Sequence, residues 1–177
     1  MKSESAISLL EILLVMTIIA LLAVIGLPRV QEFMERAQSV VCMNNLRQLG
    51  TMVENYINDN DGKYPQVETN PTDPVYQGQN VPDMAQVFGP YGLTTNTIRC
   101  PTDMSPSGSH YFTQWGSSYE WKPMLDDESQ ADPKIYSRRG VYVINPRRLR
   151  LVFDFDTIHL GRKNALYADG HVALPAM

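Results

Sequence analysis

Glu11 is the first residue whose type and position could do chemistry, because it is the one charged side chain between Ile7 and Leu27. A helix over this apolar run would be about 31 Å long, close to the thickness of the hydrocarbon core of a bilayer. A carboxylate inside that core costs about 3 kcal/mol even on mild insertion scales, so it is a functional candidate by default. The alternative is that Glu11 lies close enough to the membrane edge to reach the polar interface.

Three aspartates near the carboxyl terminus, Asp154, Asp156 and Asp169, could gather around a cation. Calcium takes six to eight oxygen ligands and prefers flexible carboxylate loops. The alternative is that Asp154 and Asp156, two residues apart on one strand, both face solvent. No serine or histidine belongs to a recognisable nucleophile–base motif, so we do not expect the chain to be an enzyme. We also expect no resident cofactor. Calcium, at the three aspartates, is the one metal ion that we consider.

His159 could be a metal ligand or a pH-dependent switch, although we favour a structural hydrogen bond that closes the last hairpin. The two cysteines, Cys42 and Cys100, either form a disulfide or remain two separate buried thiols. Their spacing is not that of a zinc site. A disulfide would close a long loop and contribute about 4 kcal/mol on the chain-entropy model.

These residues need a long helix to position them. Beyond Pro28 the apolar residues continue in steps of three and four, which indicates an amphipathic helix with one buried stripe. Pro28 should bend this helix without ending it, and Gly62 follows a stop signal. We therefore expect one helix from Ile7 to Asn58, whose second half packs on its own domain through Val30, Phe33, Met34, Ala37, Val40, Val41, Leu46, Leu49, Val53, Tyr56 and Ile57.

The rest of the chain predicts a small sheet. Residues 65–137 are rich in proline and polar residues, with one short helix near Met84–Phe88 and one short strand near Ser118–Trp121. Asp169-Gly170 is a strong hairpin signal between two of the later β-rich segments. Four antiparallel strands are expected at residues 140–144, 149–155, 164–168 and 171–174. The fold class is therefore α+β, with the long N-terminal helix packed on a small antiparallel sheet.

The leader MKSESA is short and polar and ends in Ala6, and Glu11 follows four residues after Ile7. This arrangement resembles the type IV prepilin signal, which pilins share with the pseudopilins of type II secretion. The resemblance implies that a prepilin peptidase cuts between Ala6 and Ile7, that Ile7 is then N-methylated, and that Glu11 meets the amine of a neighbouring subunit. The family usually has glycine before the cut and phenylalanine after it, where this chain has Ala6 and Ile7.

Three further segments resemble the branch of pilin-like proteins named for a carboxy-terminal H-X9-DG signature. They are CMNNLRQLG with NDNDGKYP behind it, IRCPTD, and His159 followed after nine residues by Asp169-Gly170. The resemblance implies a pilin-like fold. Surface pilins usually carry a disulfide loop near the carboxyl terminus, and this chain has no cysteine after Cys100, which favours a pseudopilin.

The implied organisation is a leader at 1–6, a transmembrane helix at 7–28 and a periplasmic domain at 29–177. The implied location is the bacterial cytoplasmic membrane, crossed once. The implied partners are the prepilin peptidase, copies of the chain and other pilins or pseudopilins. Type II secretion is the favoured function; a surface pilus for adhesion, motility or DNA uptake, and an anchored periplasmic binding module that never polymerises, remain alternatives.

Nucleic acid is not an expected partner. The formal net charge is −4, whereas a dedicated nucleic-acid binder should present a basic surface. One basic cluster does occur. We expect its charges to lie along a solvent-exposed strand edge, where they prevent that edge from pairing with another chain. Its members are Arg138, Arg139, Arg147, Arg148 and Arg150.

Overall fold

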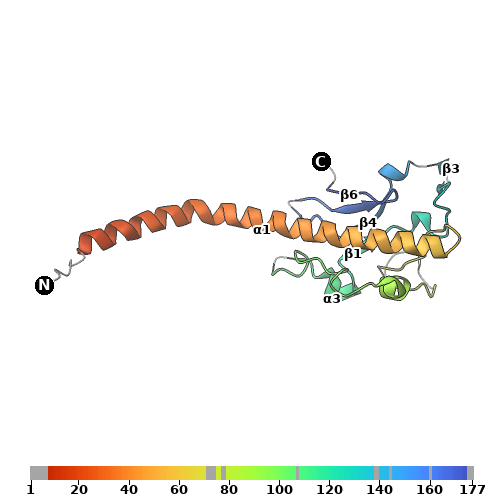
Figure 1. The fold of residues 1–177 in the computed structure, drawn as a ribbon, viewed down its shortest axis with the longest axis horizontal. Helices are drawn as coiled ribbons and strands as arrows, with labels where there is room; N and C mark the ends of the chain where they lie inside the picture. Colours follow the sequence, from red (N-terminus) through yellow and green to blue (C-terminus); the bar gives the residue numbers. More distant parts are fainter. Residues whose placement is uncertain are drawn as a thin grey trace.

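The computed structural model describes residues 8–70, 75–76, 79–106, 108–137, 140–143, 145–159 and 161–174. It is an α+β structure: a long N-terminal helix carries a small antiparallel sheet at its C-terminal half (Figure 1). Strands β4 and β6 lie on one side of this helix and the short helix α3 on the other, while the first half of the helix projects away from both. The predicted fold class is confirmed at this level.

Helix α1 runs from Leu9 to Asp59 without interruption, so it passes through position 28 as predicted. Its end also matches the predicted stop signal. Gly62 has φ +74°, and its N–H donates to the carbonyl of Ile57 at 2.9 Å, which satisfies a group that the helix leaves unpaired. The predicted first residue, Ile7, lies outside the described residues.

The buried stripe of α1 is shorter than the periodicity predicted. The helix enters the core at Cys42 and continues through Leu46, Leu49, Val53 and Ile57, at steps of three and four residues. Upstream of Cys42, the predicted stripe residues are exposed instead, and Val30, Phe33, Met34, Val40 and Val41 are each about half exposed or more. The reason is tertiary: the sheet and loops begin to cover the helix only near Ser39.

The main sheet has four antiparallel strands in the order β1-β4-β5-β6. Helix α1 contacts the last two of them, so the helix and the sheet share one core, which also holds Trp121 and Tyr64. The predicted short helix is present as α2, Met84–Phe88, with Asp83 and Gln86 forming a capping box. The strands are β1, Tyr119–Trp121; β4, Arg150–Asp154; β5, Ala165–Tyr167; and β6, Val172–Ala173.

One predicted strand is not part of this sheet. Strand β3, Gly140–Val143, pairs with β2, Lys134–Ser137, as a separate two-stranded ribbon, and β1 takes the place expected for it beside β4. All four residues of β3 are exposed, so the apolar pattern there does not mark core contact. Helix α3, Tyr111–Trp115, was not predicted; the three remaining elements are 3-10 turns at Gly89–Tyr91, Pro123–Leu125 and Pro146–Arg148.

The Asp169-Gly170 hairpin between β5 and β6 provides a test of the turn. Gly170 has φ +83° and open space where a Cβ would lie, so Gly170→Ala should be destabilising through backbone strain alone, by about 1–2 kcal/mol. Gly89→Ala is the matched control, because Gly89 has φ −52° and equally open surroundings. Denaturant unfolding of the two variants, followed by Trp121 fluorescence, measures the difference. Equal stability of the two variants would show that the turn does not require glycine.

Candidate functional site

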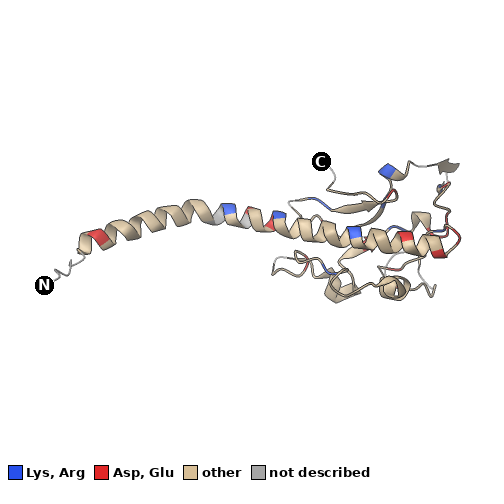
Figure 2. Cartoon of the chain, viewed as in Figure 1, with Lys and Arg blue, Asp and Glu red and all other residues tan. Residues whose placement is uncertain are grey.

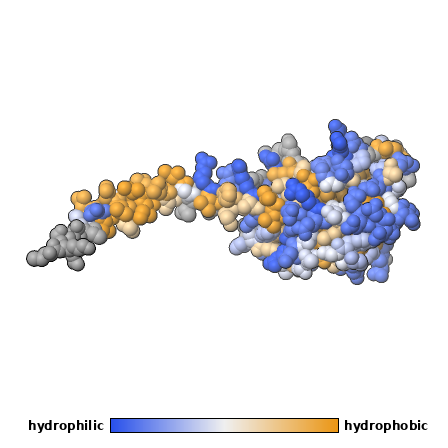
Figure 3. Space-filling view, in the orientation of Figure 1, coloured by the Kyte–Doolittle hydropathy of each residue, from blue (hydrophilic) through white to orange (hydrophobic). Residues whose placement is uncertain are grey.

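The first candidate site is the projecting half of α1. Every side chain from Ser8 to Ile25 is exposed, and Leu9–Gly26 is long and apolar enough to cross a membrane. Figure 3 shows this segment as a mostly hydrophobic surface, with a small hydrophilic patch near its start, that leads into a mostly hydrophilic domain. Its charge is confined to one place: Glu11 lies in the first turn of the helix, and the described part of the segment is otherwise uncharged up to Arg29 (Figure 2).

Glu11 is therefore far from the other predicted site residues. Thirty-one helical residues separate it from Cys42, which corresponds to about 47 Å. A negative charge in the first turn of a helix is favourable with the helix dipole. The predicted cleavage residues Ala6 and Ile7 lie outside the described residues.

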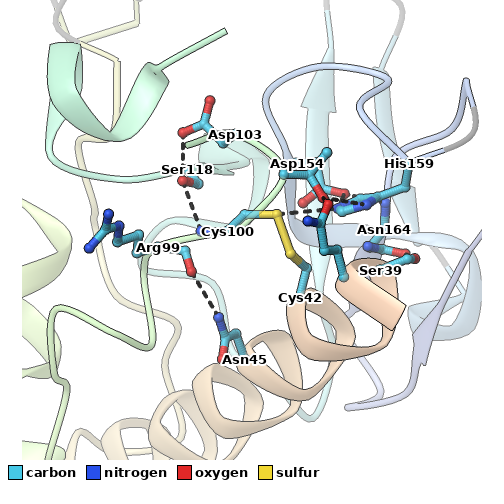
Figure 4. Close-up of a disulfide and its surroundings, with 12 residues drawn as sticks. Ser39, Cys42, Asn45, Arg99, Cys100, Asp103, Ser118, Asp154, His159 and Asn164 are labelled. Carbon is cyan, nitrogen blue, oxygen red and sulfur yellow. Dashed lines mark hydrogen bonds and ion pairs between the residues drawn. A yellow bond between two sulfur atoms is a disulfide. The ribbon is translucent and has the colours of Figure 1, made fainter. Parts of the chain in front are cut away.

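The second candidate site is a buried cluster in which three segments distant in the sequence meet, at Cys42, at Cys100 and at Asp154–His159 (Figure 4). Cys42 from α1 and Cys100 from the loop after α2 form a disulfide across a sequence separation of 58. Of the two alternatives that the sequence left open, the structure therefore has the bonded form. Both cysteines are fully buried.

His159 packs directly against this disulfide. Its Nε2 lies 3.4 Å from the Sγ of Cys100 and 3.5 Å from an Oδ2 of Asp154, and the side chains of His159 and Asp154 are completely buried. The structural hydrogen bond expected of His159 is present, but it goes to Thr102 and not to the last hairpin. The backbone of His159 forms a small turn with Arg162. The N–H of His159 donates to the carbonyl of Arg162 at 3.1 Å, and the N–H of Arg162 donates to the carbonyl of His159 at 3.0 Å.

The other ring nitrogen of His159 indicates the tautomer. The hydroxyl of Thr102 donates to Gln38 at 3.2 Å, so its oxygen is left to accept a hydrogen bond from Nδ1–H of His159 at 3.3 Å. This arrangement places the proton of a neutral imidazole on Nδ1. The lone pair of Nε2 then faces the disulfide and the carboxyl group of Asp154.

Asp154 is the last residue of β4, and its burial contradicts the prediction of a solvent-facing carboxylate. Its Oδ2 accepts the N–H of Asn164 at 2.6 Å, whereas its Oδ1 has no hydrogen-bond partner. Burial raises the pKa of Asp154 to about 8, although the hydrogen bond from the N–H of Asn164 acts to lower that pKa. Burial likewise lowers the pKa of His159 to about 4.

A second buried carboxylate supports the cluster from outside. Asp103 accepts the backbone N–H groups of Tyr111 and Phe112 at 2.9 Å, which anchors the start of α3. It also accepts the hydroxyl of Ser118 at 2.7 Å, and the oxygen of Ser118 accepts the N–H of Cys100 at 3.0 Å. This chain of hydrogen bonds holds the backbone at Cys100 in position.

The three aspartates considered for calcium do not come together. Asp154 lies in the core, Asp156 accepts the hydroxyl of Ser109, and Asp169 pairs with His171 and lies 3.7 Å from the guanidinium of Arg147. Calcium needs several oxygens directed at one point, and these three carboxylates have separate partners. In the described structure these three aspartates therefore do not form one common site.

The Asp154–His159 pair predicts a specific dependence of stability on pH. Folded, the pair holds one proton between about pH 4 and 8; unfolded, the ordinary pKa values of 3.8 and 6.5 apply. From pH 6.5 to 8 the folded chain keeps a proton that the unfolded chain has lost. The free energy of unfolding should therefore decrease as pH rises through this window, by at most about 2 kcal/mol, and stay level between pH 4 and 6.5.

Denaturant unfolding at a series of pH values measures this effect. Asp154→Asn should abolish the decrease between pH 6.5 and 8, because the pair then has no carboxyl proton to retain. His171→Gln is the control, since His171 is exposed and belongs to the other histidine–aspartate pair. A parent chain equally stable at pH 6.5 and 8 would contradict the proton-sharing pair.

Sequence reasoning did not identify the residues that complete the cluster. Thr102 and Asp103 lie within the quoted segment IRCPTD, but that segment carried no prediction of their contacts. Ser118 and Asn164 had no signal of their own. Arg138 and Arg139 of the basic cluster lie outside the described residues, while Arg147, Arg148 and Arg150 are at least partly exposed.

The chain was compared with known proteins by three routes. No protein-family model, no curated protein and no solved structure matches it.

Proposed function

We propose that this chain is a structural subunit of a type IV pilus-like filament, specifically a pseudopilin of a type II secretion system, which assembles through helix α1. The observation that carries the proposal is the form of α1. One continuous helix has an exposed apolar first half and a second half that is the central element of a folded domain. Such a helix can be stored in a lipid bilayer and then packed against copies of itself.

The exposed apolar residues beyond the membrane-length segment support packing between subunits. Val30, Phe33 and Met34 follow the candidate span, and Val40 and Val41 lie one to two turns later, all of them exposed. Burying apolar surface contributes about 25 cal/mol per Å². A lipid anchor has no need for an apolar surface outside the bilayer, whereas neighbouring helices in a filament would cover it.

Glu11 supplies the charge that such a packing can recognise. Cleavage after Ala6 would create an amine at Ile7, and an amine and a carboxylate about 4 Å apart attract by about 4 kcal/mol at an effective dielectric constant near 20. Part of that energy offsets the loss of hydration of both charges. The pair therefore contributes to the register between subunits more than to their net affinity.

The domain is also compatible with a pseudopilin. The disulfide joins α1 to the middle of the chain, whereas surface pilins usually carry theirs near the carboxyl terminus. A filament subunit of this kind needs no active site, and its function is mechanical. The domain is carried at a constant distance from the filament axis by a rigid helix.

Processing by a prepilin peptidase tests the proposal. Co-expression with the peptidase should yield a chain that begins at Ile7, lighter by residues 1–6 and heavier by one methyl group. Intact mass spectrometry of the membrane fraction measures this change, with a known prepilin as positive control. A chain that retains its leader while the control is cut would argue against the proposal.

A deletion strain then separates the favoured function from its alternatives. For a pseudopilin, loss of the gene should block the release of secreted proteins, and its overproduction should give filaments that are visible by electron microscopy. Normal secretion with loss of surface fibres would instead identify a surface pilin. A processed chain that never enters a sheared or cross-linked polymer would identify an anchored binding module.

A further inference from the structure

We propose that the chain whose cysteines are still thiols binds one zinc ion in the buried cluster of Cys42, Cys100, His159 and Asp154. The ligands would be the two thiolates, Nε2 of His159 and a carboxylate oxygen of Asp154. The metal and the disulfide exclude each other, because both use the same two sulfur atoms. The proposal is independent of filament assembly.

Three ligand atoms, the two sulfurs and a ring nitrogen of His159, are already grouped around one point, and Asp154 lies beside the histidine as the fourth ligand. The two sulfur atoms and one ring nitrogen of His159 all lie within 4.8 Å of one another. Nε2 of His159 is 3.4 Å from the sulfur of Cys100 and 3.5 Å from the Oδ2 of Asp154. With zinc–ligand bonds of about 2.0–2.3 Å, the ligand atoms of a tetrahedral site lie about 3.3–3.8 Å apart. Opening the sulfur–sulfur bond is the main rearrangement that the site requires.

His159 is already oriented as a metal ligand. A ligating histidine usually forms a hydrogen bond through its second ring nitrogen, which fixes its orientation and leaves the other lone pair for the metal. Thr102 forms this contact with Nδ1 at 3.3 Å, and its own hydroxyl hydrogen is engaged with Gln38. The free lone pair of Nε2 points toward the sulfurs (Figure 4).

Asp154 provides the second, independent indication of a ligand. Its side chain is completely buried, and Oδ1 has no hydrogen-bond partner, although a buried carboxylate normally has all its oxygens paired. A cation beside it would stabilise the ionised form. Ser118 and Asp103 hold the backbone of Cys100 from the opposite side, so the cluster is rigid on both flanks.

The chemistry of the ligands selects zinc over calcium. Thiolates and imidazole suit zinc, while calcium prefers oxygen ligands alone. Four protein ligands, here all buried, are typical of a structural zinc site. Binding releases the two thiol protons and the carboxyl proton of Asp154, because each ligand binds the metal in its deprotonated form. Oxidation by a disulfide-bearing protein would take two electrons from the thiolates, form the sulfur–sulfur bond and expel the zinc ion.

Cobalt titration of the full chain in detergent tests the proposal. The untagged protein is reduced in urea with a phosphine, which takes oxygen from water to become its oxide, and is returned to native buffer without air. One equivalent of Co²⁺ should then give a sulfur-to-cobalt charge-transfer band and the visible spectrum of tetrahedral cobalt, and Zn²⁺ should remove both. The oxidised chain should give neither band.

His159→Gln should weaken cobalt binding by the reduced chain at least about tenfold. His171→Gln is the matched control and should bind like the parent, since His171 is exposed and far along the chain from the cysteines. If the reduced parent gives no charge-transfer band, or if both histidine variants bind equally well, the proposal is wrong.

X-ray absorption of the reduced zinc-bound parent avoids any dependence on the folding of a variant. The expected coordination is two sulfur atoms at about 2.3 Å and two nitrogen or oxygen atoms at about 2.0 Å. Four sulfur ligands would show zinc shared between chains and would overturn the proposal. Glu11→Ala should bind zinc like the parent, so failure of the filament proposal and failure of the zinc proposal are distinguishable.

Discussion

Glu11→Ala should leave insertion into the membrane unchanged or improved and should reduce incorporation into filaments by at least about tenfold. Removing a carboxylate from an apolar helix makes insertion easier. In the filament proposed above, the same change would leave the amine of Ile7 unpaired in apolar surroundings, and an uncompensated buried charge costs several kcal/mol. The measurement is the fraction of subunit in sheared or cross-linked filaments, normalised to the amount in the membrane fraction.

Thr17→Val is the matched control for this prediction. Thr17 is the other polar side chain well inside the projecting apolar segment, and its hydroxyl donates to the carbonyl of Leu14 in the same helix at 2.7 Å. It therefore has no need of a neighbouring subunit, and the variant should enter filaments like the parent. Equal incorporation of Glu11→Ala and the parent would leave Glu11 as an ordinary residue of the membrane interface.

Loss of the disulfide should produce the largest change in stability. Replacing Cys42 and Cys100 together by alanine should lower the free energy of unfolding by about 4 kcal/mol, because the bond closes a loop with a sequence separation of 58. Alanine is preferred to serine as the replacement, because a serine hydroxyl at these fully buried positions would add the cost of a buried polar group to the loss of the disulfide. Denaturant unfolding followed by Trp121 fluorescence measures the loss.

The reduced parent, kept free of metal with a chelator, is the matched control because its sequence is unchanged. It should lose a similar amount, and both effects should appear mainly as a lower denaturant midpoint. The native disulfide should also resist reduction until the domain unfolds, since both sulfurs are buried. A double alanine variant as stable as the oxidised parent would show that the other contacts between α1 and the segment around Cys100, among them the hydrogen bond from Asn45 to the carbonyl of Arg99, are sufficient to hold the two together.

Local sequence patterns were sufficient for those elements whose residues interact mainly with close neighbours along the chain. The apolar run and the three- and four-residue steps from Leu46 to Ile57 predicted the long helix, and the signal at Gly62 predicted its end. The α2 helix and the Asp169-Gly170 hairpin were predicted for the same reason. Capping, turn and periodicity rules act over a few residues, so a single sequence contains them.

Only the tertiary structure decided which of these surfaces are covered. The apolar residues between positions 30 and 41 have the same spacing as the core residues that follow, but Val30, Phe33, Met34, Val40 and Val41 are about half exposed or more. Similarly, β3 has an apolar pattern, but its four residues are exposed and it pairs with β2 outside the main sheet. The periodicity of apolar residues predicts which face of a helix or strand is apolar. It does not predict whether another element packs against that face.

The buried cluster shows the same division most clearly. The sequence by itself determined that two cysteines, a histidine and several aspartates are present, and the structure brings Cys42, Cys100 and the Asp154–His159 segment together from three separate parts of the chain. Their spacing along the chain matches no metal motif, because such motifs describe ligands that share one turn or loop. Here the long-range packing of α1 against the sheet creates the site, and a contact of that range depends on the whole fold.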